Sequence, residues 1–166
     1  MTEEPRKLTI EEAHQAFAAG YNGKVWELMD RDERTDEEDA AMLHMAHASC
    51  AHWLAAGNET HHQRGEWMIA RVNTLLGFQE SAMRHARSCM DLTMRYPDRM
   101  EDFDRAYAFE ALARAHALAG DRSEAELYIR KAEEAGEAIE DEENREIFTS
   151  DLGSGDWYGM RQDGRD

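Results

Sequence analysis

Glycines divide this chain into runs of residues that favour helix. Gly57, Gly77 and Gly120 each follow an apolar run, and Gly20 or Gly23 does the same near the N-terminus. Helices often end at glycine because this residue adopts the left-handed conformation at little cost. The runs between the glycines are rich in Ala, Leu, Met, Glu and Arg, which are good helix formers. This spacing predicts a series of helices joined by tight turns.

Signals for helix starts agree with this division. Thr9 with Glu12, and Thr35 with Glu38, have the spacing of a capping box, in which each side chain binds the other residue's free backbone N–H. Asp121 begins a further acidic helix start. We predict helices over seven ranges: 9–19, 24–32, 36–56, 61–76, 79–96, 101–119 and 122–139. Proline is confined to two positions and alternating strand patterns are absent, so we expect an all-α fold.

Composition limits the classes of partner. The length of 166 residues suits one domain with a real core. A formal net charge of −17 argues against nucleic acids and anionic membranes, because phosphate contacts need clustered Lys and Arg. The acidity either keeps a helical protein soluble or attracts a basic partner. Neither a signal peptide nor a membrane-spanning apolar run is visible, and Cys50 and Cys89 read as buried thiols, so we expect a cytoplasmic protein.

Two segments of the chain share a pattern of small residues. They are "ARVNTLLGFQESAMRHARSCM", from Ala70, and "ARAHALAGDRSEAELYIRKAE", from Ala113. In both, small residues stand seven positions before the turn glycine and five and twelve positions after it. The six residues are Ala70, Ala82, Cys89, Ala113, Ala125 and Ala132. Small side chains at these positions allow the two helices of an antiparallel hairpin to approach closely, so we expect stacked hairpins.

This pattern resembles the tetratricopeptide repeat, a helical hairpin that stacks into a solenoid and binds protein partners in its concave face. The units here repeat at 43 residues, the separation of Gly77 and Gly120, whereas the family repeats near 34. The chain is also similar to small bacterial proteins of this kind. The resemblance implies one domain over residues 1–140, clearest over 64–96 and 103–139, followed by an acidic tail over 141–166.

In that family the concave groove is formed by the first helix of each hairpin. Carried over to this chain, the resemblance implies the following groove residues: Arg64, Trp67, Arg71, Thr74, Tyr107, Glu110, Arg114 and Ala117. Arginine can hold a carboxylate through two hydrogen bonds, so we expect a protein or peptide partner with an acidic or C-terminal carboxylate end, and no cofactor. Alternatively, Trp67 belongs to the core and the arginines form surface ion pairs.

The tail carries more large apolar residues than a disordered acidic segment normally does. Those expected to dock are Phe148, Leu152, Trp157 and Tyr158. They pack either onto the last helices or groove of the same chain, or into the groove of a second copy. The second arrangement makes a homo-oligomer. No helical period is visible beyond about Phe148.

A histidine-rich run, "LHMAHASCAHWLAAG", covers residues 43–57. On a helical wheel, Leu43, His47, Cys50 and Leu54 share one stripe, which predicts a buried seam. His52 points away from Cys50, so the three histidines of the run cannot bind one ion together.

Metal binding is the alternative function. It needs partners for His44 and His47 from other segments, and the candidates are His14, His61, His62 and His85. No zinc-protease, nucleophile-elbow or phosphate-loop motif is present, and "GSG" at 153–155 precedes no predicted helix. These absences do not exclude an enzyme, but no motif recommends one. We expect an interaction module, with a metal-binding or enzymatic helical bundle as the alternative.

Overall fold

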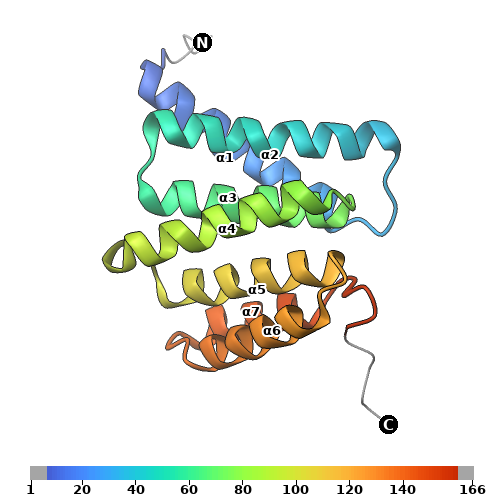
Figure 1. Cartoon of the computed structure of the whole chain (residues 1–166). Coiled ribbons are helices and arrows are strands. Elements are labelled where there is room, and N and C mark those ends of the chain that lie inside the picture. Colours follow the sequence, from blue (N-terminus) through green and yellow to red (C-terminus); the bar gives the residue numbers. More distant parts are fainter. Residues whose placement is uncertain (1–6, 161–166) are drawn as a thin grey trace.

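The computed structural model describes residues 7–160 and contains only helical elements over that range (Figure 1). The elements are α1 (Ile10–Met29), α2 (Asp36–Ala56), α3 (Glu59–Leu75), α4 (Gln79–Arg95), the short 3-10 helix η1 (Pro97–Arg99), α5 (Asp102–Leu118), α6 (Arg122–Glu137) and α7 (Glu142–Gly153). The prediction of an all-α fold with about seven helices is confirmed.

Consecutive helices pair as antiparallel hairpins. The closest pairs are α1 with α2, α3 with α4, and α5 with α6, while α2 packs on α3 and α4 on α5. The first helices α3 and α5 also meet each other, and α7 packs on both α5 and α6. Figure 1 shows the α1–α2 hairpin at one end and α5, α6 and α7 at the other. The described chain is thus a row of three hairpins closed by a seventh helix.

The predicted helix ends are mostly correct. Both capping boxes form, at Thr9 and at Thr35, and Asp121 caps α6. Gly77 and Gly120 adopt the left-handed conformation, with φ of 78° and 74°. Gly57 does not, because its backbone is extended with φ of −116°. The left-handed cap expected there is wrong.

The small residues of the repeated pattern lie inside the hairpins, and none of the six is more than 1% exposed. Both cysteines are buried free thiols, as expected. Burial of such small side chains allows helix axes to approach closely, and this contact brings each hairpin together.

The prediction of two helices before residue 32 is wrong. Residues 10–29 form one helix that continues through Gly20 and Gly23. A glycine within a helix costs only about 1 kcal/mol relative to alanine. Val25, beyond both glycines, is fully buried in the core, and this packing outweighs the cost. The continuous helix carries Trp26 to the inner side of the hairpins.

The tail contains a helix that the sequence pattern missed. Asp141 starts α7 by accepting a hydrogen bond from the backbone N–H of Asn144 at 2.8 Å. Phe148 and Leu152 of α7, with Trp157 beyond it, are buried in one apolar cluster with residues of α5 and α6. Residues 142–160 therefore pack on the last hairpin of the same chain.

Candidate binding groove

The first helix of each hairpin, together with α7, lines a groove that we call the inner groove. It consists of two adjoining cavities of about 430 and 420 Å³. Trp26 of α1, Trp67 of α3 and Asp151 of α7 line both cavities, while Tyr107 and Glu110 of α5 line one each. Four helices far apart in the sequence thus contribute to one surface.

Four aromatic rings, one from each helix, form a continuous ladder, and the first three of them line this groove. Trp26 stacks on Trp67 with ring centroids 5.5 Å apart. Trp67 meets Tyr107 edge to face at 5.2 Å, and Tyr107 meets Phe148 in the same way at 4.8 Å. Edge-to-face and offset stacked pairs are the favoured contacts of aromatic rings. The ladder gives the groove a rigid apolar floor.

A buried ion pair lies beside the ladder. Glu110 and Arg114, one helical turn apart on α5, are each only 1% exposed, and the Arg114 Nε donates to Glu110 Oε1. Glu110 also accepts a hydrogen bond from the indole N–H of Trp67 at 2.9 Å. A buried charge is tolerated only when it is paired and hydrogen-bonded. This pair therefore fixes the orientation of Trp67.

Arg114 also holds the end of the chain. Its guanidinium donates to the carbonyl oxygens of Asp151 and Ser154, at 2.9 and 3.0 Å, and lies 4.2 Å from the ring centre of Trp157. We call residues 154–160 the C-terminal segment. These contacts occupy N–H groups of the Arg114 guanidinium within the chain. The α5 side of the groove is therefore covered by the chain's own C-terminal residues.

Two tyrosine hydroxyls make further hydrogen bonds on this side of the groove. Tyr158 donates to the carbonyl oxygen of Thr74, and Tyr107 donates to the Asp151 carboxylate at 2.5 Å. Burial raises the pKa of both tyrosines, and for Tyr107 the hydrogen bond with Asp151 adds to this effect. Burial also raises the pKa of Asp151. Both hydroxyls therefore remain neutral donors at physiological pH.

Arg71 differs from the other groove arginines. It makes no hydrogen bond or ion pair with any residue from 7 to 160, although it lines the cavity of about 420 Å³. Burial, followed by the nearby charge of Arg114, lowers its pKa. Gly155, with φ of 74°, lies close to the Arg71 side chain, because a Cβ at position 155 would lie 2.8 Å from Arg71 Nη2. A partly buried guanidinium that hydrogen-bonds to none of the residues from 7 to 160 is suited to bind an anion.

The remaining groove residues suggested by the sequence are already engaged within the chain. Arg64 donates to both carboxylate oxygens of Asp104, at 2.8 and 3.0 Å. Trp67 is 8% exposed and belongs to the main apolar core as well as to the groove. The side chains of Thr74 and Ala117 are buried.

Trp26 was missing from the predicted set. The resemblance implied groove residues only in the two clearest units, 64–96 and 103–139, and therefore none from α1. Asp151 was also missing, because no helical period was recognised around it.

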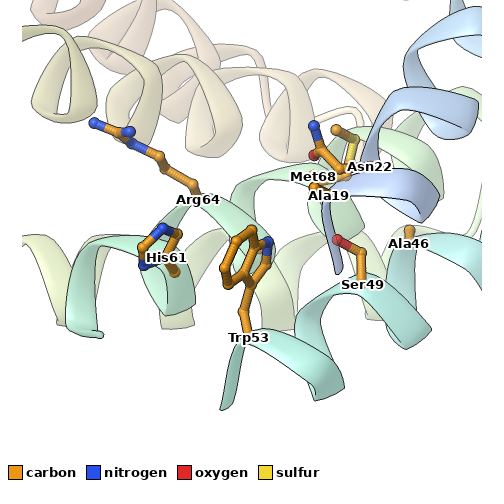
Figure 2. A pocket seen from close by; sticks show the side chains of 9 residues that line it. Ala19, Asn22, Ala46, Ser49, Trp53, His61, Arg64 and Met68 are labelled. Carbon is orange, nitrogen blue, oxygen red and sulfur yellow. The ribbon is translucent and has the colours of Figure 1, made fainter. Parts of the chain in front are cut away.

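A smaller pocket of about 220 Å³ lies between α1, α2 and α3 (Figure 2). Figure 2 shows the indole of Trp53 rising from α2 beside His61 of α3, with Asn22 of α1 across the pocket. The Trp53 and His61 rings stack with centroids 4.1 Å apart, and burial lowers the pKa of His61. Asn22 and Arg64 also line the larger inner cavity. The two spaces therefore share one wall of α1 and α3.

The buried seam predicted for the histidine run is wrong. His47 is exposed and Leu54 is 60% exposed, and the buried residues of α2 are Met42, Ala46, Ser49 and Cys50. A helical wheel carries no information on the neighbouring helices, and contact with α1 and α3 rotates the buried face of α2 by about one residue. His44 is also exposed. Cys50 alone of the predicted seam is fully buried.

Comparison with known proteins gave no match: no family model, no curated protein and no solved structure is similar to this chain. No helix within the described range is long and apolar enough to cross a membrane. The function therefore has to be inferred from the geometry of the groove and its side chains.

Proposed function

We propose that this protein is an interaction module that binds the carboxyl end of a partner polypeptide in its inner groove. The observation that carries the proposal is Arg71, whose guanidinium faces a cavity and hydrogen-bonds to none of the described residues. Arginine binds carboxylates through paired hydrogen bonds. The aromatic ladder beside it supplies an apolar surface for the last side chains of a bound peptide. The resemblance to tetratricopeptide repeats is part of this proposal.

A single terminal carboxylate suits the groove better than an acidic run. Asp30 and Asp32 line the same cavity near the end of α1, while the two arginines beside them, Arg31 and Arg34, are paired with Glu38 and Asp39. The protein also carries a formal net charge of −17, so a strongly acidic peptide is repelled at long range. One carboxylate at Arg71 and apolar residues against Trp26 and Trp67 match both the charge and the shape.

As far as residue 160, the chain leaves a cavity of about 420 Å³ in this part of the groove. The C-terminal segment hydrogen-bonds to Arg114 and Thr74, and Gly155 lies close to Arg71, whereas Trp26 lines the same cavity from α1. A ligand would therefore bind between α1 and Gly155 without displacing α7. The partner completes a site that the chain has filled only in part.

Selection from a random dodecapeptide library with free carboxyl ends tests this function. We expect the full-length protein to enrich peptides with apolar final residues. Arg71→Gln should reduce the affinity of these peptides at least tenfold, since about 1.4 kcal/mol is lost when one charge-assisted contact goes. Fluorescence anisotropy of individual labelled peptides gives the affinities.

Arg130→Gln is the matched control, because it removes the same charge from an exposed position on α6. It should bind the selected peptides as the wild type does. Equal affinity for wild type and Arg71→Gln, or equal binding of amidated peptides, would show that the groove does not recognise a carboxylate.

A further inference from the structure

A cluster of metal-ligating side chains lies between α2, α3 and α4, away from the inner groove. Cys50 comes from α2, His62 and Glu66 from α3, and their nearest ligand atoms all lie within 4.8 Å of one another. His62 Nε2 is 3.3 Å from Glu66 Oε1. His85 of α4 lies 2.6 Å from the other carboxylate oxygen of Glu66. None of these four residues lines the inner cavities.

The crossing of α2 and α3 creates this cluster. Gly65 packs directly against Cys50, and a Cβ at position 65 would lie 2.8 Å from the Sγ atom and 3.4 Å from the Cα atom of Cys50. Only glycine allows this approach without displacement. His62 and Glu66 lie four residues apart, on one side of α3, so both side chains reach toward the Cys50 thiol from the same helix.

We propose that Cys50 Sγ, His62 Nε2 and Glu66 Oε1 bind one divalent transition-metal ion of the zinc class. Thiolate, imidazole and carboxylate are the three ligand types that zinc takes in proteins. With metal–ligand bonds of about 2.0–2.3 Å, tetrahedral ligands lie roughly 3.3–3.8 Å apart. The histidine and carboxylate already have this separation, and the 4.8 Å that encloses one ligand atom from each of the three residues exceeds it by only about 1 Å.

His85 has a separate role in this proposal. It holds the second oxygen of Glu66 and so fixes the direction of the carboxylate, as the hydrogen-bonding partners of metal ligands commonly do. It is therefore a positioning residue. The metal replaces the proton of the Cys50 thiol, and this proton passes to solvent. The His62 side chain is 32% exposed, which gives the ion a path of entry and leaves a fourth coordination position open to water.

A second pair of histidines could bind metal nonspecifically and must be separated from this site. His14 and His52 approach each other at 2.8 Å between their Nδ1 atoms, where α1 packs on α2. Neither belongs to the Cys50 cluster. The sulfur ligand distinguishes the two places.

Cobalt titration of the untagged, chelator-treated full-length protein tests the proposal. We expect one equivalent of Co²⁺ to bind and to give the near-ultraviolet charge-transfer absorption of a cobalt–thiolate bond. One equivalent of Zn²⁺ should remove this absorption. Cys50→Ser should abolish it. His85→Asn should weaken binding by about 10- to 100-fold, and Glu66→Gln, which removes a ligand, should weaken it at least as much.

Cys89→Ser and His52→Asn are the matched controls, and both should keep the absorption and the stoichiometry. Circular dichroism checks that each variant is folded. X-ray absorption of the zinc-loaded wild type gives an answer that needs no variant, and one sulfur among the ligands is expected. A folded wild type without the cobalt–thiolate absorption, its persistence in Cys50→Ser, or a zinc shell without sulfur would overturn the proposal.

Discussion

At the scale of single residues, Gly136 determines how closely α7 packs on the last hairpin. It is buried near the end of α6, and a Cβ there would lie 2.5 and 2.6 Å from two ring carbons of Phe148. Phe148 is the last ring of the aromatic ladder and contacts Tyr107. The absence of one side chain in α6 therefore positions the end of the groove.

Gly136→Ala should lower the free energy of unfolding by about 1–3 kcal/mol, the usual cost of overpacking a well-packed core. Gly20→Ala is the contrasting variant, because a Cβ at position 20 has no neighbour within 4 Å. It should raise the free energy of unfolding by about 0.5–1 kcal/mol through helix propensity. Urea unfolding followed by circular dichroism measures both. A neutral Gly136→Ala would show that the Phe148 contact is looser than described.

The resemblance to tetratricopeptide repeats implied a stripe of groove residues on α3. Trp67 and Arg71 fall on the expected stripe of α3 and line the inner cavities. Their hydrogen-bonding partners could not be read from the sequence, because these come from elements distant in the chain. Arg114 illustrates this point: the sequence left it either as a groove residue for a partner's carboxylate or as a surface ion pair, whereas the structure buries it against Glu110 and the carbonyl groups of the tail. Glu66 could not be singled out as a ligand from the sequence, because the chain has so many acidic residues.

At the scale of elements, α7 and the C-terminal segment pack on the last hairpin and cover its apolar face. Phe148, Leu152 and Trp157 are each at most 5% exposed. Without them, α5 would expose Tyr107 and the buried ion pair of Glu110 and Arg114 to water. The terminal element thus contributes both core packing and one wall of the groove.

Deletion of residues 141–166 should lower the melting temperature or cause aggregation, since it removes three buried side chains and bares the face of α5. Single substitutions give the same test with less disturbance. Phe148→Ala should cost about 3–5 kcal/mol, while Ile147→Ala, at a half-exposed position of the same helix, should cost much less. Thermal and urea unfolding compare them. An unchanged melting temperature after the deletion would contradict packing of the tail on its own chain.

Helix starts and ends were largely predictable because capping and glycine signals are local. Thr35, Asp121, Gly77 and Gly120 all act as their residue types suggested. The failures occurred where packing outweighs local preference. Gly20 lies inside a helix held by its apolar face, and the buried face of α2 is set by two neighbouring helices.

At the scale of the whole molecule, the stacking of hairpins places chemically distinct sites on different helices of one small core. The first helices and α7 line the inner groove, whereas the Cys50 cluster joins α2, α3 and α4. Only α3 contributes to both. Binding at the Cys50 cluster would therefore stabilise the central hairpin that also carries Trp67 and Arg71, because a ligand held only by the folded state raises its stability.

The four tryptophans provide reporters for the central claim, that the inner groove binds a chain end through Arg71. Trp26 and Trp67 line the cavity beside Arg71, Trp157 lies under Arg114, and Trp53 lies in the smaller pocket. Each has one indole N–H signal in a proton–nitrogen correlation spectrum, assigned by single Trp→Phe substitutions.

The most direct measurement is a titration of the full-length protein with N-acetyl-leucyl-leucine, as the free acid and as the amide, observed through these signals. We expect the free acid to shift the Trp26 and Trp67 signals together and to leave Trp53 in place. The amide, and the free acid with Arg71→Gln, should bind at least tenfold more weakly. Equal shifts with acid and amide, or shifts confined to Trp53, would contradict carboxylate recognition in the inner groove.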